Sequence, residues 1–313
     1  MQVAALNPSA DFLDEIKAAG ITPPDEIIAD GQLHRFASNG KPRDNAGWYV
    51  LHDGAIPAGA FGDWRTGTEG KWCTKASREF TPAEKKAYAA RMHEIRNQRA
   101  AEEITRHADA RHRAEDIWNK SRPAPDDHVY LHAKGIKAHG LRVYAGSLVV
   151  PLKNGGLHSL QFISGDGSKR FLTGGRVAGC CYSIGKLNGT LCVVEGFATG
   201  ASIFKSTGHA VAIAFNAGNL LAVAKAARAK YPDTKIVLCA DDDIGTVGNP
   251  GITKAREAAQ AVGGLVAVPD FGATRPEGAS DFNDLHRLAG VEAVRACVEN
   301  STPNLGEQHA NEN

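Results

Sequence analysis

The sequence predicts an α/β fold in which a parallel sheet is flanked by helices, and two observations carry this prediction. From Leu191 onward, apolar runs alternate with helix-like segments, which places strands near 191–195, 210–215, 235–240 and 265–268 and helices near 198–206, 219–230 and 251–262. Two of these runs also end on acids, Glu195 and the triplet 241–243, although carboxylates are poor strand residues. Because α/β proteins bind ligands at the carboxyl ends of their strands, these acids predict a functional edge of the sheet.

Residues 1–80 predict a separate N-terminal module that is rich in β structure. Short β-like runs are interrupted there by glycines and turn residues. Aromatic and basic side chains alternate in its second half, and Trp64, Arg65 and Trp72 could stack on and neutralise single-stranded DNA. The alternative is that the tryptophans form the core of a small domain. The module is therefore expected to bind DNA or a protein partner.

Residues 81–125 predict a long helix that links the module to the rest of the chain. Thr81 and Glu84 have the spacing of a capping box, and Pro123 and Pro125 end the helical pattern. Acidic and basic residues nearly balance along it, which favours a solvated spacer over a nucleic-acid-binding arm. The two prolines also predict a position where the chain could be cut with little loss of core.

Residues 126–186 predict a smaller β-rich subdomain that precedes the parallel sheet. Apolar runs on both sides of Asn154-Gly155 indicate a hairpin. A basic segment follows, in which Lys169, Arg170 and Arg176 are expected to contact the phosphates of a template or nucleotide. A solvated basic turn is the alternative interpretation.

The acids at the strand ends predict a metal site. Glu195, Asp241 and Asp243 supply the hard oxygen ligands that suit Mg²⁺ or Mn²⁺. Asp241 and Asp243 alternate along an extended backbone, so both can face one ion while Asp242 points away. Glu195, from another strand, could bind metal or act as a general base. Alternatively, the triplet caps the following helix or forms a solvated turn.

These motifs together resemble a known family. Glu195-Gly196 at one strand end and Asp241-x-Asp243 at another resemble the Toprim domain of bacterial-type primases, topoisomerases and some nucleases. The upstream hairpin and the segments 130–136 and 280–285 narrow the resemblance to the Toprim primases of phages, plasmids and other mobile elements. It covers residues 126–290, which makes 126–186 a primase-core subdomain and 187–300 the Toprim domain. Residues 301–313 are polar and predict a disordered tail.

The resemblance implies a DNA primase-like nucleotidyltransferase that makes short RNA primers on single-stranded DNA from ribonucleoside triphosphates, with Mg²⁺ or Mn²⁺. It implies acid–base catalysis by Glu195 and a further acid, Asp281, near the metal, although Asp281 is equally suited to cap a helix. The sequence lacks a cysteine-rich zinc ribbon and a G-x-x-x-x-G-K-[ST] motif, so any helicase would be a separate protein. A type IA topoisomerase needs large further domains that do not fit in this length.

The same residues are also compatible with two other functions. A Toprim nuclease or nicking enzyme would use the same carboxylates on a DNA phosphodiester, although the basic segment 169–176 favours a primase. A catalytically idle DNA-binding accessory protein is the third possibility, which the intact acids disfavour.

Composition is typical of a protein of the cytoplasm rather than of a membrane. Hydrophobic residues make up 42% of 313 positions, yet no apolar stretch reaches the roughly 18 residues of a membrane span. No signal peptide is indicated at the N-terminus, and the six cysteines contain no CxxC pair, which favours reduced thiols. The net charge of +1 requires any nucleic-acid surface to be a local patch.

Overall fold

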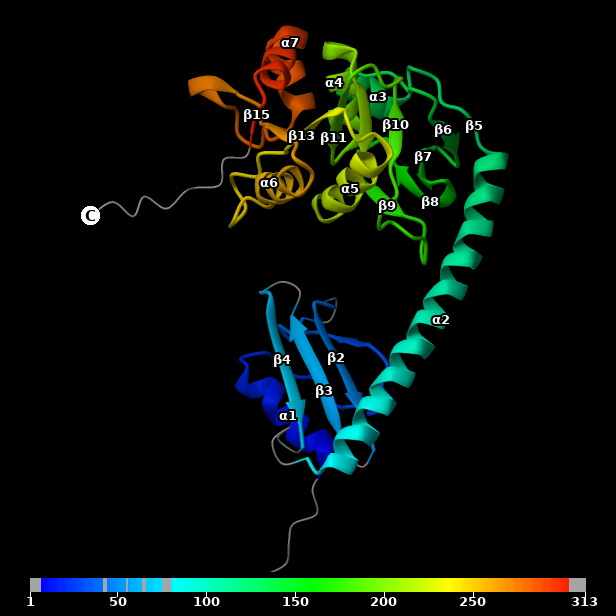
Figure 1. The fold of residues 1–313 in the computed structure, drawn as a ribbon, viewed down its shortest axis with the longest axis vertical. Helices are drawn as coiled ribbons and strands as arrows, with labels where there is room; N and C mark the ends of the chain where they lie inside the picture. The colour runs from blue at the N-terminus through cyan, green and yellow to red at the C-terminus, as the bar shows by residue number, and fades with distance from the viewer. Residues whose placement is uncertain (1–6, 42–43, 55, 64–65, 75–79, 304–313) are drawn as a thin grey trace, which may run out of the picture. The chain divides into compact units, whose positions relative to one another are not determined.

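The chain divides into two compact units, Met1–Ala100 and Ala101–Asn313. The computed structural model describes residues 7–41, 44–54, 56–63, 66–74 and 80–303 (Figure 1). Among the described helices, none has the length and apolar character needed to cross a membrane. The two units are described separately below.

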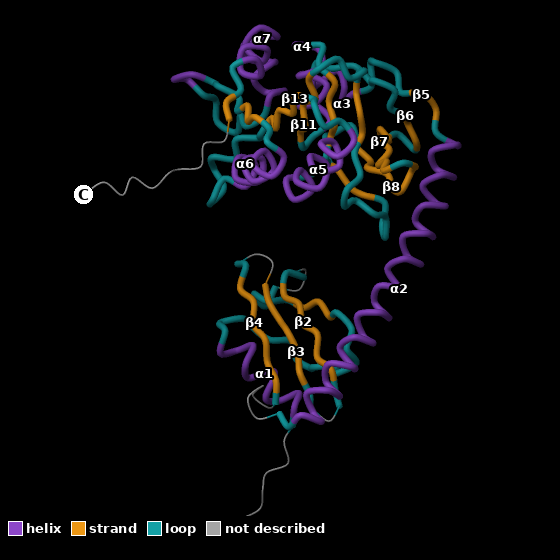
Figure 2. Tube along the Cα trace, viewed as in Figure 1, coloured by secondary structure: helices purple, strands orange, loops and turns teal. Residues whose placement is uncertain are grey.

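The N-terminal unit contains a helix packed on an antiparallel sheet (Figure 2). Helix α1 (Pro8–Ala18) begins after the N-cap Asn7 and buries Phe12 and Ile16. The sheet has the order β1 (His34–Phe36), β2 (Gly47–His52), β3 (Ala58–Asp63) and β4 (Thr68–Cys73). The small β-rich module was predicted, whereas α1 was not.

Helix α2 (Pro82–Lys120) begins at the predicted capping box, in which the Thr81 amide donates to Glu84 Oε2 over 2.7 Å. The prediction that this helix is a solvated spacer is wrong for its C-terminal half, which is partly buried. Ala110 and Ala114 are fully buried, and Ala114 belongs to a core cluster with Val149, Leu160 and Phe162, against which Ile117 and Trp118 pack. Alanines one turn apart lie on the same face of a helix and let it pack closely against a sheet. The C-terminal half of α2 therefore contributes to the core of the second unit.

An antiparallel sheet of five strands follows, in the order β5 (Arg122–Pro123), β6 (Arg142–Tyr144), β7 (Ser147–Asn154), β8 (Gly156–Ile163) and β9 (Lys169–Phe171). The short helix α3 (Val129–Lys134) lies between β5 and β6 in sequence. The predicted hairpin is confirmed: β7 and β8 pair, and Gly155 turns between them with a φ of +71°. A core fragment that starts at residue 126, as predicted from the two prolines, would lose β5, which pairs with β6. The expectation that this cut exposes little core is therefore wrong.

The last sheet confirms the predicted α/β fold. Strands β11 (Thr190–Val194), β12 (Ala210–Ile213), β13 (Lys235–Cys239) and β14 (Leu265–Ala267) run parallel. With the outer strands β10 (Tyr182–Ile184) and β15 (Thr302–Pro303), the sheet order is β10-β12-β11-β13-β14-β15. Helices α4 (Phe197–Thr207) and α7 (Phe282–Glu299) cover one face, whereas α5 (Leu220–Lys230) and α6 (Pro250–Val262) cover the other (Figure 1).

Both outer strands differ from the expected boundaries. Strand β10 (Tyr182–Ile184), expected in the preceding subdomain, pairs antiparallel with β12. Strand β15 (Thr302–Pro303), expected in a disordered tail, pairs antiparallel with β14. Such short edge strands are specified by the neighbour they pair with, which a local polar pattern cannot indicate.

Candidate carboxylate site at the edge of the parallel sheet

The candidate site forms where two neighbouring parallel strands end. Val194 and Cys239 are register partners on β11 and β13. Glu195 follows β11 directly, and Asp241 lies two residues beyond β13. The pairing therefore brings both acids to the same edge, as the sequence predicted.

The acids lie close enough to perturb one another. Burial, together with the Asp243 carboxylate, raises the pKa of Glu195 to about 7. Burial and the carboxylates of Glu195, Asp281 and Asp243 raise the pKa of Asp241 well above its ordinary value. The Lys169 ammonium opposes both shifts. Glu195, Asp241, Asp243 and Asp281 thus form one carboxylate cluster with a single neighbouring cation among the causes of these shifts.

Two oxygens of the carboxylate cluster lack a partner in the described part of the chain. Glu195 Oε1 and Asp241 Oδ1 are buried and accept no hydrogen bond there. A buried carboxylate oxygen without a donor is costly, so each is suited to receive a cation or a proton. The donor set and its charge fit a divalent metal ion.

The carboxylates do not yet converge. No three His, Cys, Asp or Glu side chains among the described residues are arranged to hold a metal ion as they stand. Like charges that approach without a cation repel one another, so metal binding requires these side chains to turn toward a common point.

Asp281 also caps a helix and Asp243 bonds to the first turn of another, in line with the alternative interpretations. Asp243 Oδ2 accepts a hydrogen bond of 3.2 Å from the amide of Gly251, in the first turn of α6. A Cβ at Gly251 would lie 2.2 Å from the Asp241 carbonyl oxygen, so glycine allows this close approach. Asp281 Oδ1 accepts from the amides of Asn283 and Asp284 at the start of α7. These described bonds use one oxygen of each carboxylate.

The family comparison agrees with this geometry. Residues 190–292 match the family model of the Toprim domain. This segment is a Toprim domain. The predicted resemblance is confirmed, and the carboxylate cluster lies within the matched segment.

The chain is also similar to two Escherichia coli proteins named DNA primase TraC. One is 35% identical over 291 residues, which cover 86% of this chain and 27% of the relative. The other is 34% identical over 298 residues, covering 86% of this chain and 20% of the relative. The chain therefore spans about a quarter of the length of the first relative and a fifth of the second. Among solved structures, the zinc-binding and RNA polymerase domains of Aquifex aeolicus primase align with 14% identity and a TM-score of 0.41, covering 93% of this chain and 83% of that one.

Of the predicted basic residues, Lys169 lies beside the carboxylate cluster, although it belongs to the preceding antiparallel sheet and not to the Toprim domain. It begins β9, and its Nζ would be 3.8 Å from a Cβ placed on Gly196. Arg170 instead lies over the Phe162 ring, 4.3 Å from its centroid. Arg176 donates through Nε to the Ala178 carbonyl over 3.0 Å. The structure thus brings one of the three cations to the carboxylates.

The aromatic residues of the N-terminal unit are only partly described. Trp64 and Arg65 lie outside the described residues. Trp72 packs edge-on against Phe12, with ring centroids 5.6 Å apart, which matches the core alternative. Trp72 also lines a cavity of about 500 Å³ together with Trp48 and Tyr88.

The structure adds site residues to which sequence reasoning gave no role. The Tyr130 hydroxyl is buried without a hydrogen-bond partner among the described residues, and burial and the Asp281 carboxylate raise its pKa. Lys134 Nζ lies 3.9 Å from Asp284 Oδ1, and the Lys134 carbonyl accepts from Asn283 Nδ2 over 2.8 Å. Helix α3 therefore adjoins the Toprim helix α7. The resemblance of segment 130–136 to the Toprim primases was the sequence signal that could have pointed to Tyr130 and Lys134.

Proposed function

We propose that this chain is a DNA primase-type nucleotidyltransferase that synthesises short RNA primers on single-stranded DNA. The observation that carries the proposal is the carboxylate cluster, in which Glu195 and Asp241 present buried, unpartnered oxygens at the carboxyl edge of the Toprim sheet. Ribonucleoside triphosphates would be its substrates. The similarity to two named DNA primases supports this choice.

The carboxylate cluster would hold Mg²⁺ or Mn²⁺. Glu195, Asp241 and Asp243 are the proposed ligands, with Asp281 beside them. A bound metal stabilises the attacking and leaving oxygens of phosphoryl transfer. In the metal-free chain, burial and the Asp243 carboxylate raise the pKa of Glu195 to about 7. Glu195 would serve as the general base that accepts the proton of the 3′ hydroxyl. Lys169, the neighbouring cation, would bind the incoming triphosphate.

The other parts of the chain would hold the template. Arg170 and Arg176 would contact its phosphates from the 126–186 subdomain, which precedes the Toprim domain proposed at 187–300. In the N-terminal module, Trp64, Arg65 and Trp72 would hold single-stranded bases and phosphates. A separate replicative helicase would supply the unwound template, and the cytoplasm of a cell carrying a phage, plasmid or other mobile element is the proposed location.

Incubation with labelled ribonucleotides and a single-stranded template tests the proposal. New template-dependent oligomers that require Mg²⁺ or Mn²⁺ are expected. Shortening of the template without new oligomers would instead identify a nuclease or nicking enzyme. Template binding with neither reaction would identify an idle accessory protein. The Asp241→Asn variant is the control that removes a carboxylate from the proposed site.

A further inference from the structure

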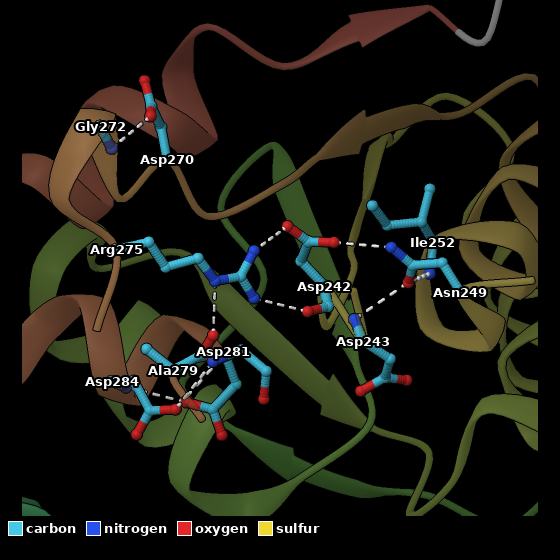
Figure 3. Close-up of polar contacts among 11 residues, drawn as sticks. Asp242, Asp243, Asn249, Ile252, Asp270, Gly272, Arg275, Ala279, Asp281 and Asp284 are labelled. Atoms are coloured by element: carbon cyan, nitrogen blue, oxygen red, sulfur yellow. Dashed lines mark hydrogen bonds and ion pairs between the residues drawn. The ribbon is translucent and has the colours of Figure 1, made fainter. Parts of the chain in front are cut away.

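We propose that Arg275 is a positioning residue that fixes the acidic triplet 241–243 relative to the segment carrying Asp281. This inference rests on the proposed metal-dependent function, because it concerns the spacing of the same metal ligands. Arg275 lies between β14 and α7 and was not singled out by its sequence context. Its contacts indicate that it acts through Asp242, the carboxylate between Asp241 and Asp243 (Figure 3).

The Arg275 guanidinium makes three directed contacts. Nη1 donates to Asp242 Oδ2, Nη2 donates to the Asp242 carbonyl over 2.7 Å, and Nε donates to the Ala279 carbonyl over 2.7 Å. The guanidinium carbon also lies 4.8 Å from the centroid of the Phe271 ring. The side chains of Arg275 and Asp242 are only 20% and 16% exposed. A planar fork of donors at a largely buried carboxylate is a rigid contact that a lysine could not reproduce.

The second Asp242 oxygen is also occupied. Asp242 Oδ1 accepts from Asn249 Nδ2 over 2.6 Å, and Asn249 Oδ1 accepts from the Asp243 amide over 2.9 Å. Asn249 is at the same time the N-cap of α6. Both oxygens of Asp242 are therefore used inside the protein, and Asp242 is withdrawn from metal binding. The backbone of Asp243 is fixed by the same network.

The network reaches Asp281 through the backbone. The Asp242 amide donates to the Ser280 carbonyl over 2.8 Å, one residue before Asp281. Arg275 donates to the carbonyls of both Ala279 and Asp242. It therefore links the segment before α7 to the triplet through a second set of bonds. This arrangement fixes the backbone of the triplet relative to that of Asp281, so that the mutually repelling carboxylates need only turn their side chains to meet a cation.

Charge and geometry make opposite predictions for the loss of Arg275. Removing a cation beside the carboxylate cluster makes it more negative, which alone would strengthen metal binding. Removing the carboxylate of Asp242 makes the surroundings of the carboxylate cluster less negative, and this charge effect alone would weaken metal binding. If Arg275 positions the ligands through Asp242, both changes weaken metal binding, because both release the triplet.

The test is Mn²⁺ binding to the full chain, measured by electron paramagnetic resonance, with thermal unfolding of the metal-free protein alongside. We expect Arg275→Gln and Asp242→Asn each to raise the Kd for Mn²⁺ by about tenfold, and the double variant to raise it no further, since the pair acts as one unit. The charge-conserving Arg275→Lys variant keeps the test valid if Arg275→Gln folds poorly, because charge alone predicts an unchanged Kd, whereas loss of the planar donor fork predicts a higher one.

Arg228→Gln is the matched control. Arg228 donates to the carbonyls of Val262, Pro232 and Thr234 from the other helix layer and contacts no carboxylate in these bonds. It should lower the unfolding temperature without changing the Kd for Mn²⁺. An unchanged or lower Kd in Arg275→Gln, or effects that multiply in the double variant, would overturn the positioning role. A wild-type chain that binds no Mn²⁺ would overturn the proposed metal site and this role with it.

Discussion

Asp241 and Asp243 illustrate, at the scale of residues, how one acidic triplet divides its tasks. Asp241 has a buried oxygen with no partner among the described residues, whereas Asp243 uses one oxygen at the start of α6. Asp242, between them, is held by Arg275. Three identical side chains thus differ in role because their neighbours in space differ.

Asp243→Asn should reduce primer synthesis by about a hundredfold or more, since one ligand of the proposed metal is lost. The metal-free protein should keep its unfolding temperature, because an asparagine oxygen can still accept from the Gly251 amide. Primer synthesis and thermal unfolding in EDTA measure the two effects. Asp270→Asn is the control, because Asp270 accepts from the Gly272 amide away from the cluster (Figure 3). Near-normal synthesis by Asp243→Asn would contradict its role as a ligand.

Glu195→Gln should stabilise the metal-free protein at alkaline pH. The pKa of Glu195 rises from 4.5 to about 7 on folding, so the folded state binds this proton more tightly than the unfolded state. Stability is therefore lost as pH rises from about 4.5 to 7, and the full loss persists above that range. Glutamine removes the effect, which we expect to be about 1–2 kcal/mol after allowing for partial exposure.

Urea unfolding in EDTA at pH 4 and pH 8 checks this expectation. The wild-type and Glu195→Gln proteins should differ at pH 8 and approach one another at pH 4. A difference of the same size at both values would mean that the ionisation of Glu195 is not its cause.

At the scale of elements, α2 combines two environments in one helix. Its N-terminal half belongs to the first compact unit and its C-terminal half to the second. The buried face of the second half is built from Ala110 and Ala114, which give little hydrophobic signal in a strongly charged sequence. That weak signal explains why this half of α2 was predicted to be a spacer.

A fragment that starts at residue 126 should be less stable than one that starts at residue 101. Loss of residues 101–125 removes β5 and uncovers the cluster containing Val149, Leu160 and Phe162. Since burial of one large apolar side chain contributes about 1.5–3 kcal/mol, we expect at least about 3 kcal/mol of destabilisation. Urea unfolding of both fragments provides the measurement. Equal free energies of unfolding would show that α2 does not complete this core.

At the scale of the whole molecule, the proposed division of labour separates template binding from chemistry. The 101–313 fragment contains every member of the carboxylate cluster and Lys169. If the N-terminal module holds template, this fragment should synthesise primers but bind single-stranded DNA more weakly than the full chain. Its affinity should also depend less steeply on salt, because fewer phosphates are neutralised.

DNA affinity across a salt series, measured for the fragment and the full chain, decides this point. A shallower slope for the fragment is the expected result. Identical affinities and slopes would show that residues 1–100 do not hold template, and the module would then be better suited to a protein partner.

The sequence by itself determined the order of strands and helices in the Toprim domain and the placing of Glu195 and Asp241 at one edge. These features follow from local signals: apolar runs of strand length, capping residues, and acids directly after β strands. The hairpin at Asn154-Gly155 was predictable for the same reason, since its turn residues specify their own backbone conformation.

Only the tertiary structure decided which residues support the site from a distance. Arg275 reaches Asp242 across 33 residues of sequence, and α3 brings Tyr130 and Lys134 to the start of α7. The edge strands β10 and β15 likewise exist because neighbouring strands offer them partners. Local patterns report what a segment prefers, whereas these contacts depend on which unrelated segments folding brings together.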